Sequence, residues 1–513
     1  MTTKAPEIDK RQLWASRFKK GTDPRAKAYS ESITVDRHMF YQDVWGSEAH
    51  TIMLGYTGIN TDSQTKNILQ GLQKVKASFR DGSWDLQEAE EDVHMNVERF
   101  VIDDVGLENG GRMHTTRSRN DQVVLDTKMY ARDMIIEVQK ELGNLIEVLL
   151  VQAKDHTETL MPGYTHVQHA QPITYAYWLT HYVAVFLRDL KRLAAAEEEV
   201  DTNPLGAGAL TGTTFAIDRN LTTRLLGFSE TQEHSMDAVT ARDFNVQILS
   251  ALSILFSSIS RLADEIIYGI TQEFGTLVLD DSFAMGSSMM PQKKNPGVLE
   301  LVRARTGKMY GILMAMLTTL KALPSGYNRD YHEDKETMVE ALNLAKNTLT
   351  LMAGVMETLK IKKERMKSLV LENYSAATEL ANYLVVVHNI PFRQCHRIVG
   401  YVVGELVEEG KTFEDKARTK QLFAEKDIAI SDKDLDDYTN PKRIVERTTS
   451  LGGVAPKEVD RMIGDMNQKL KQYRNRIEKK ESELANAKKE TAQIIESILS
   501  GKTVKESVSK IVR

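Results

Sequence analysis

The chain has 513 residues, of which 41% are hydrophobic and 27% charged. This composition is typical of a folded globular protein rather than a disordered one, and the length favours about two to four packing units. The formal net charge of −5 provides no global basic field, and the single cysteine, Cys395, excludes a disulfide within the chain. We therefore expect no nucleic-acid partner and a reducing compartment.

The N-terminal segment, residues 1–20, is polar and lacks the apolar core of a secretory signal. The most apolar stretch of the chain, residues 251–270, is interrupted by Arg261, Asp264 and Glu265. Charges at these positions predict a buried helix rather than a membrane span. We expect a soluble cytoplasmic protein with no membrane partner.

Four long stretches carry apolar residues three and four apart, a pattern that buries one face of an α-helix. They cover residues 135–149, 179–193, 248–266 and 342–359. Long helices packed nearly parallel form an elongated bundle, and no run of period-2 alternation competes with them. The predicted fold class is therefore all-α. Beyond Pro456, an apolar heptad predicts a long terminal helix that packs on its own subunit or on a partner.

The segments between these stripes are rich in Gly, Ser, Thr, His and Asn, and such loops on a rigid scaffold often carry chemistry. Residues 285–297 hold two serines, two lysines and an asparagine between glycines. Glycines suit a loop that closes over a substrate. Backbone amides, a lysine and an asparagine are able to hold developing negative charge. A polar surface loop is the alternative that composition leaves open.

Three further segments contain candidate binding groups. Residues 111–121 place three arginines with hydroxyl and amide donors before a helix, which indicates either a carboxylate site or a helix cap with solvated charges. Residues 163–169 contain His166 and His169, but no third ligand follows at metal-site spacing, so we expect no metal. Residues 203–214 are glycine-rich, yet without a preceding strand or a lysine they are a weak candidate for a phosphate loop.

The sequence GSSMMPQKKNP at positions 286–296 resembles the signature loop of the fumarase/aspartase superfamily. Within that superfamily, the stretches at 91–94, 114–122, 162–168, 235–237, 242–244 and 327–330 resemble those of the argininosuccinate lyases, and the resemblance extends from about Leu13 to Leu470.

The resemblance implies three helical domains around a long central bundle, at residues 1–116, 117–365 and 366–513. It also implies a homotetramer whose active sites are shared between subunits. The implied activity is cleavage of the C–N bond of argininosuccinate to arginine and fumarate, without a cofactor. The alternative is a related lyase that releases fumarate from another N-succinyl amine.

The resemblance also implies roles for individual residues. Ser287 would be the base that removes a proton from Cβ of the succinyl group. Lys293 and Asn295 would bind the carboxylate over which the carbanion charge spreads, and His166 with Glu300 resembles the family's histidine–carboxylate pair. The remaining expected substrate contacts are Ser32, Asp92, His94, Ser118, Arg119, Asn120, Thr165, Tyr327, His332 and Lys335.

Some positions depart from the family's usual pattern. Thr116 stands where glycine is usual, His169 replaces an arginine, and Ser16 and Ala207 also differ. His332 stands where glutamine usually helps to hold the arginine half. If its imidazole faces the substrate, titration would make binding vary between about pH 5.5 and 7.5. These departures leave the amine specificity open.

A structural role on the same fold, like that of the family's lens crystallins, is a further alternative. Retention of Ser287, His166 and Lys293 favours an enzyme. The chain beyond about Leu470 also exceeds what the family usually carries.

Overall fold

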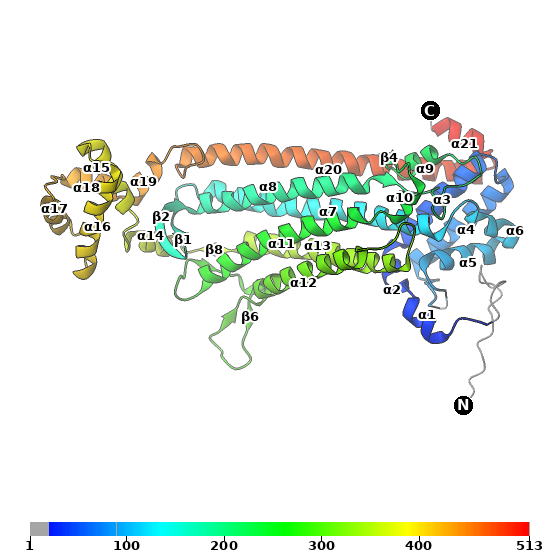
Figure 1. Ribbon diagram of the computed structural model, residues 1–513, viewed down its shortest axis with the longest axis horizontal. Helices are drawn as coiled ribbons and strands as arrows, with labels where there is room; N and C mark the ends of the chain where they lie inside the picture. The colour runs from blue at the N-terminus through cyan, green and yellow to red at the C-terminus, as the bar shows by residue number, and fades with distance from the viewer. Residues whose placement is uncertain (1–19, 89, 512–513) are drawn as a thin grey trace.

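The computed structural model describes residues 20–88 and 90–511, so Ser16 lies outside the described residues. Long helices run side by side along a rod, with a cluster of shorter helices at each end (Figure 1). The bundle helices are α7 (Arg119–Asp155), α8 (Tyr175–Val200), α11 (Asp243–Ile270), α12 (Gly297–Leu320) and α13 (Glu333–Thr358). Each of the four predicted apolar stripes lies along one of these helices, and their side chains share one continuous core. The all-α fold class is confirmed.

Helix α11 occupies the middle of this bundle, against α8 and α12. By length and composition alone, it is the one helix in the described part of the chain that could cross a membrane. Of its most apolar window, 61% is buried inside the structure, and Ile248, Leu255 and Leu262 belong to the bundle core. These contacts agree with the buried helix expected for residues 251–270.

The N-terminal helices form a layer at one end of the rod (Figure 1). They are α1 (Pro24–Ser30), α2 (Ile33–Asp36), α3 (Phe40–Tyr56), α4 (Asp62–Asp81), α5 (Val93–Val105) and α6 (Leu107–Gly110). Their core includes Phe40, Trp45 and Leu69, together with Leu125 and Met129 from the start of α7. Two short helices, α9 (Arg219–Leu225) and α10 (Ser235–Thr240), lie at the same end.

The opposite end carries a separate helical cluster with its own core, which includes Leu384, Cys395 and Phe423. Its members are α14 (Lys363–Leu371), α15 (Ala377–His388), α16 (Phe392–Glu408), α17 (Lys416–Ala424), α18 (Asp432–Thr439) and α19 (Pro441–Arg447).

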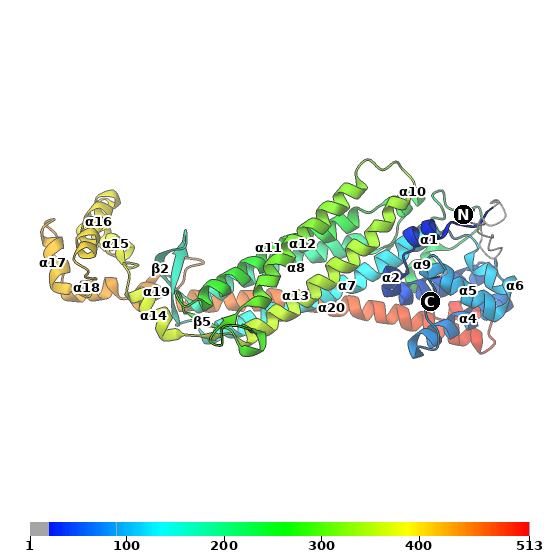
Figure 2. The same cartoon turned by 90° about the horizontal axis from the view of Figure 1, so that it is seen from below.

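The predicted terminal helix is α20 (Pro456–Leu499), which runs back along the full bundle to the N-terminal layer in both views (Figure 1, Figure 2). It packs on α7 and α8 of its own chain. Ile494 and Ile498, with Val504 and Val508 of α21 (Val504–Ile511), enter the N-terminal core. The segment beyond Leu470 therefore joins the bundle to the N-terminal layer.

All strands are short and paired two by two. They are β1 (Leu160–Thr165) with β2 (Gln168–Thr174), β3 (Thr202–Asn203) with β4 (Glu230–Thr231), β5 (Leu277–Val278) with β8 (Lys360–Ile361), and β6 (Met285–Gly286) with β7 (Lys294–Asn295). The β1–β2 hairpin was expected only as a loop. His166 and Val167 connect its strands, and both have positive φ, as in the turns whose twist matches a β-hairpin.

Candidate active site

The expected site residues lie in three groups at different positions along the rod (Figure 1). One group surrounds the start of α7, beside α2, α5 and the start of α13. The second is the turn of the β1–β2 hairpin, and the third is the loop between β6 and β7. No ion pair joins His166 to Glu300 among the described residues of the chain. The described residues of this chain therefore do not form the histidine–carboxylate pair implied by the resemblance.

The first group surrounds a cavity of about 490 Å³. Five of the expected substrate contacts line it, and they come from α5, α7 and the segment before α13: Asp92, Arg119, Asn120, Tyr327 and His332. Glu91, Met95, Val123 and Arg329 complete the wall. Sequence segments separated by more than 200 positions are thus brought to one cavity.

A capping box fixes the start of α7 and with it two of these side chains. The Oγ of Ser118 accepts a hydrogen bond from the Asn120 N–H at 3.3 Å, and the Ser118 N–H donates to Asp121 Oδ1 at 2.9 Å. Arg119 and Asn120 are therefore the first residues of the helix. The Arg119 Nε lies 3.8 Å from Asp92 Oδ2, so a cation and an anion face the cavity together.

Asp92 is ionised at neutral pH. Burial alone would raise the pKa of its carboxyl, but Arg119, His94 and the Met95 N–H outweigh burial and lower the pKa to about 2. The sequence led us to expect that His332 titrates near its ordinary pKa, and the structure differs. Burial, with the nearby Lys335 and Arg329, lowers the pKa of His332 to about 4. Its expected titration therefore lies below pH 5.5 rather than between 5.5 and 7.5.

The glycine-rich segment 203–214 supports this group and does not form a phosphate loop. The N–H groups of Gly206 and Gly208 donate to Asp121 Oδ2 at 3.0 and 2.9 Å. The Asn120 amide donates to the Ala209 carbonyl at 3.0 Å. Amides that would cradle a phosphate are thus occupied by a carboxylate of the same chain.

Ser32 and Lys335 lie beside the cavity and contact each other. The Lys335 ammonium is 3.2 Å from Ser32 Oγ and pairs with the buried Asp36, which also accepts from Ser32 Oγ at 2.7 Å. The neighbouring Asp334 pairs with Arg242, whose guanidinium lies 4.6 Å from the Tyr331 ring centroid. These buried pairs fix the first turn of α13, which carries Lys335.

His94 is buried beneath the cavity and does not line it. Its Nδ1 lies 2.8 Å from Asp43 Oδ1 and 3.4 Å from Asp126 Oδ2. Burial opposes ionisation of Asp43, but His94 and Arg117 hold the pKa of that carboxyl below its ordinary value. Burial, and after it the Asp43 charge, raise the pKa of Asp126 well above its ordinary value. The pKa values of the two carboxyls are thus shifted in opposite directions, and both groups face His94.

Sequence reasoning missed both carboxylates. Among the described residues, the ligand atoms of Asp43, His94 and Asp126 lie close enough together to hold a metal ion. However, Arg117 already supplies positive charge to Asp43. The sequence offered little signal, because Asp43 is one of two acidic residues in α3, a helix that is buried over most of its length.

In the second group, Thr165 and His166 are exposed at the hairpin turn, and His166 has a φ of +54°. His169 is not a metal partner for His166, because its two ring nitrogens contact Tyr164 Oη at 3.2 Å and Asn373 Nδ2 at 2.9 Å. The imidazole of His166 makes no such contact among the described residues. The hairpin thus presents Thr165 and His166 outward from the rod.

The third group lies on the loop between β6 and β7. The Ser287 Oγ accepts hydrogen bonds from the Met290 N–H at 3.0 Å and from the Met289 N–H at 3.3 Å. On the β7 side of the loop, opposite Ser287, the Lys293 Nζ lies 2.5 Å from Asn295 Oδ1. Three of the expected residues are thus held on one exposed loop. The fourth, Glu300, follows in the first turn of α12 and is also exposed.

Two family models and a set of relatives match the chain. A family model described as Lyase matches residues 16–311, and one described as Argininosuccinate lyase C-terminal matches residues 374–446. The argininosuccinate lyase of Symbiobacterium thermophilum is 43% identical over 453 residues, which are 88% of this chain and 97% of the relative. That of Oceanobacillus iheyensis is 44% identical over 452 residues, again 88% and 97% of the two chains.

Solved structures give the same result for the fold. An EDDS lyase in complex with formate has a TM-score of 0.83 and 30% identity, with 93% of this chain and 95% of that chain covered. A class II fumarase from Schistosoma mansoni shares the fold alone, with a TM-score of 0.69 and 14% identity over 81% of this chain and 92% of that chain. With relatives this similar over nearly their whole length, the chain belongs to the argininosuccinate lyase family.

Proposed function

We propose that this chain cleaves argininosuccinate to arginine and fumarate. The observation that carries the proposal is the loop between β6 and β7, where a serine hydroxyl receives two backbone N–H groups and a lysine–asparagine pair lies opposite. The relatives named argininosuccinate lyase support the choice of substrate.

Ser287 acts as the base in this proposal. An alkoxide is a strong enough base to remove the Cβ proton, but it forms only where positive potential stabilises it. The N–H groups of Met289 and Met290 point at the oxygen that becomes charged, and the Lys293 ammonium lies on the same loop. Once the proton has left Cβ, the carbanion charge spreads into the adjacent carboxylate, which Lys293 and Asn295 bind. The carbanion electrons then form the C=C bond of fumarate, and the C–N bond breaks with its electron pair going to the guanidinium nitrogen.

The cavity at the start of α7 holds the rest of the substrate. Arg119 and Asn120 offer donors at a helix N-terminus, where a carboxylate is favoured. Asp92 stays ionised and so attracts an ammonium or guanidinium group. His332 is neutral at pH 7 and donates or accepts one hydrogen bond, as the usual glutamine would. His94 contributes indirectly in this proposal, by packing under the cavity.

Four copies of the chain assemble so that the three groups meet at shared sites. Large apolar side chains exposed on α11 and α12 support this assembly, since burying them against another copy is favourable. They are Ile254, Leu301, Tyr310, Met314 and Leu317. We place the enzyme in the cytoplasm, because its single cysteine is buried and unpaired.

Fumarate release, followed by ultraviolet absorbance with argininosuccinate as substrate, tests the reaction. Ser287→Ala should lower turnover by about 10²- to 10⁴-fold, the usual effect of removing a proton-transfer group. Ser288→Ala is the matched control on the same loop and should stay within about threefold of the parent. Equal activity of the two variants would remove Ser287 from the mechanism.

Mixed assemblies test whether the sites are shared. Ser287→Ala and His166→Asn chains, each inactive alone, are unfolded together, reassembled at equal amounts and assayed. If each site takes Ser287 and His166 from different chains, about a quarter of the sites in a random mixture contain both native residues. Activity near that level supports shared sites. Hybrids as inactive as either variant would mean that one chain supplies both residues.

A related lyase acting on another N-succinyl amine is the second candidate. His332 at a position that is usually glutamine favours it, as does the similarity to a protein named EDDS lyase, solved with bound fumarate. Parallel assays with adenylosuccinate and ethylenediaminedisuccinate distinguish the two. If the protein turns over either compound but not argininosuccinate, the first proposal is wrong and the second is supported.

A further inference from the structure

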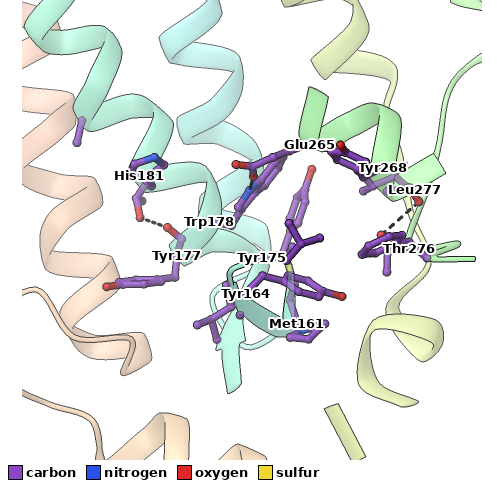
Figure 3. Close-up of a pocket in the computed structure, with 18 of the residues that line it drawn as sticks. Met161, Tyr164, Tyr175, Tyr177, Trp178, His181, Glu265, Tyr268, Thr276 and Leu277 are labelled. Atoms are coloured by element: carbon purple, nitrogen blue, oxygen red, sulfur yellow. Dashed lines mark hydrogen bonds between the residues drawn. The ribbon is translucent and has the colours of Figure 1, made fainter. Parts of the chain in front are cut away.

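A second cavity, of about 650 Å³, lies behind the β1–β2 hairpin (Figure 3). It is bounded by β1 and β2, the first turns of α8, the last turn of α11 and the start of α20. None of the expected site residues lines it. The family reaction therefore leaves this cavity without a role.

Aromatic rings form much of its wall. Tyr175 and Trp178 stack with their ring centroids 5.4 Å apart, and Phe274 lies 5.8 Å from Tyr164 and 6.1 Å from Tyr268. Figure 3 shows Tyr164, Tyr175 and Trp178 gathered around the cavity, with Glu265 beside Trp178. Ring faces carry partial negative charge and attract cations, most strongly for tryptophan. A cavity of this kind favours a flat or alkylated cation over an anion.

Glu265 adds a full negative charge to this aromatic wall. One of its oxygens accepts a hydrogen bond from Trp178 Nε1, and no ion pair among the described residues includes Glu265. Among the residues that the structure describes, no lysine or arginine lines the cavity. The remaining basic group, His181, has a lowered pKa because it is partly buried and lies near Arg261. The carboxylate therefore has no lysine or arginine partner among the described residues of the wall.

We infer that this cavity binds a small organic cation, a guanidinium, amidinium or alkylammonium group attached to an apolar body. The rings hold the body, and Glu265 binds the charged end by charge-assisted hydrogen bonds. Tyr164 and Val167 line the cavity and flank Thr165 and His166 in the hairpin. A bound cation thus packs directly behind the turn that presents the proposed catalytic histidine.

Benzamidine and benzamide form a matched pair of probes, since they share shape and size and differ in charge. Calorimetric titration of the full-length assembled protein should show that benzamidine binds at least about tenfold more tightly than benzamide. Glu265→Gln should abolish that preference. Asp264→Asn removes the neighbouring carboxylate, which pairs with Arg303 outside the cavity, and should preserve it.

Tryptophan fluorescence locates the site. Benzamidine should quench the protein's fluorescence, and Trp178→Phe should remove most of that response while leaving a weaker calorimetric signal. Absence of benzamidine binding to the assembled protein would mean that another subunit covers the cavity, and the inference would fail. It would fail equally if Glu265→Gln bound benzamidine as the parent does, or if fumarate displaced the probe. Neither readout depends on turnover, so an error in the proposed function would not imitate these outcomes.

Discussion

Replacement of Thr116 by glycine should stabilise the protein. Thr116 has a φ of +67°, and its buried hydroxyl has no hydrogen-bond partner. A left-handed conformation costs a non-glycine residue about 1–2 kcal/mol, and an unsatisfied buried hydroxyl costs about 1–3 kcal/mol. Glycine returns about 0.5–1 kcal/mol of this through its greater freedom in the unfolded chain. Thr116→Gly should therefore raise the free energy of unfolding by about 1–4 kcal/mol.

Thr116→Ala separates the two causes, because it removes the hydroxyl and keeps the strained Cβ. Urea midpoints, compared at one fixed protein concentration so that assembly contributes equally, should rank glycine above alanine above threonine. Turnover should stay within about threefold, since the capping box of Ser118 and Asp121 fixes the following helix independently. A glycine variant no more stable than the alanine variant would show that backbone strain here is no larger than the conformational freedom that glycine gains in the unfolded chain. One less stable than the parent would refute the whole account.

Three further outcomes are expected. His332→Gln and the parent should show parallel KM–pH curves from about pH 5.5 to 7.5, because the imidazole is already neutral there. The pKa of His332 is about 4 in the folded protein and near 6.5 in the unfolded chain, so the free energy of unfolding should fall as the pH drops through this range. The urea midpoints of the parent and His332→Gln should therefore diverge between about pH 6.5 and 4. Truncation after Lys479 removes Ile494 and Ile498 from the N-terminal core, so it should lower the urea midpoint more than it lowers turnover per assembled tetramer. Dialysis against EDTA should leave turnover unchanged, because Lys293 and the loop amides supply the positive potential; activity lost to EDTA and restored by zinc would indicate a metal in the Asp43–His94–Asp126 group.

The long helices could be predicted because each has one buried and one exposed face. Helix α12 is the exception, and no stripe marked it in the sequence. Met309 and Met316 are buried on one side, while Tyr310, Met314 and Leu317 are exposed on the other. A helix that is apolar on both sides gives little periodic signal. In the proposed tetramer the second side would be covered by another copy, so the missing stripe itself agrees with assembly.

The β1–β2 hairpin could not be predicted from sequence rules, for a local reason. Hairpin turns with positive φ are usually recognised by asparagine or glycine, whereas here the two turn residues are His166 and Val167. A β-branched residue with positive φ is unfavourable and is kept only where the surrounding structure imposes it. Strain at these positions coincides with the proposed catalytic histidine. The resemblance identified the residue, but only the structure shows the turn that presents it.

Asp43 and Asp126, the buried carboxylates beneath the cavity, could not be predicted from the sequence for a different reason. Sequence reasoning assigned His94 to the substrate because it follows Asp92 in a recognisable stretch. Spacing along a helix does not tell which neighbour points outward, and here Asp92 caps the helix while His94 turns inward to Asp43 and Asp126. An isolated acidic residue in a buried helix is uninformative until its partner from another helix is known.

The three site groups differ in how complete each one is within a single chain. The serine loop supplies its own N–H donors and its own lysine–asparagine pair, and the cavity at α7 already has Arg119 opposite Asp92. By contrast, His166 stands exposed on its turn, and Glu300 has no ion-pair partner among the described residues. Groups that bind charge are thus arranged within a single chain, whereas in the proposed tetramer His166 and Glu300 would meet partners from another copy. Assembly is therefore the step that would bring proton transfer and substrate binding into one site.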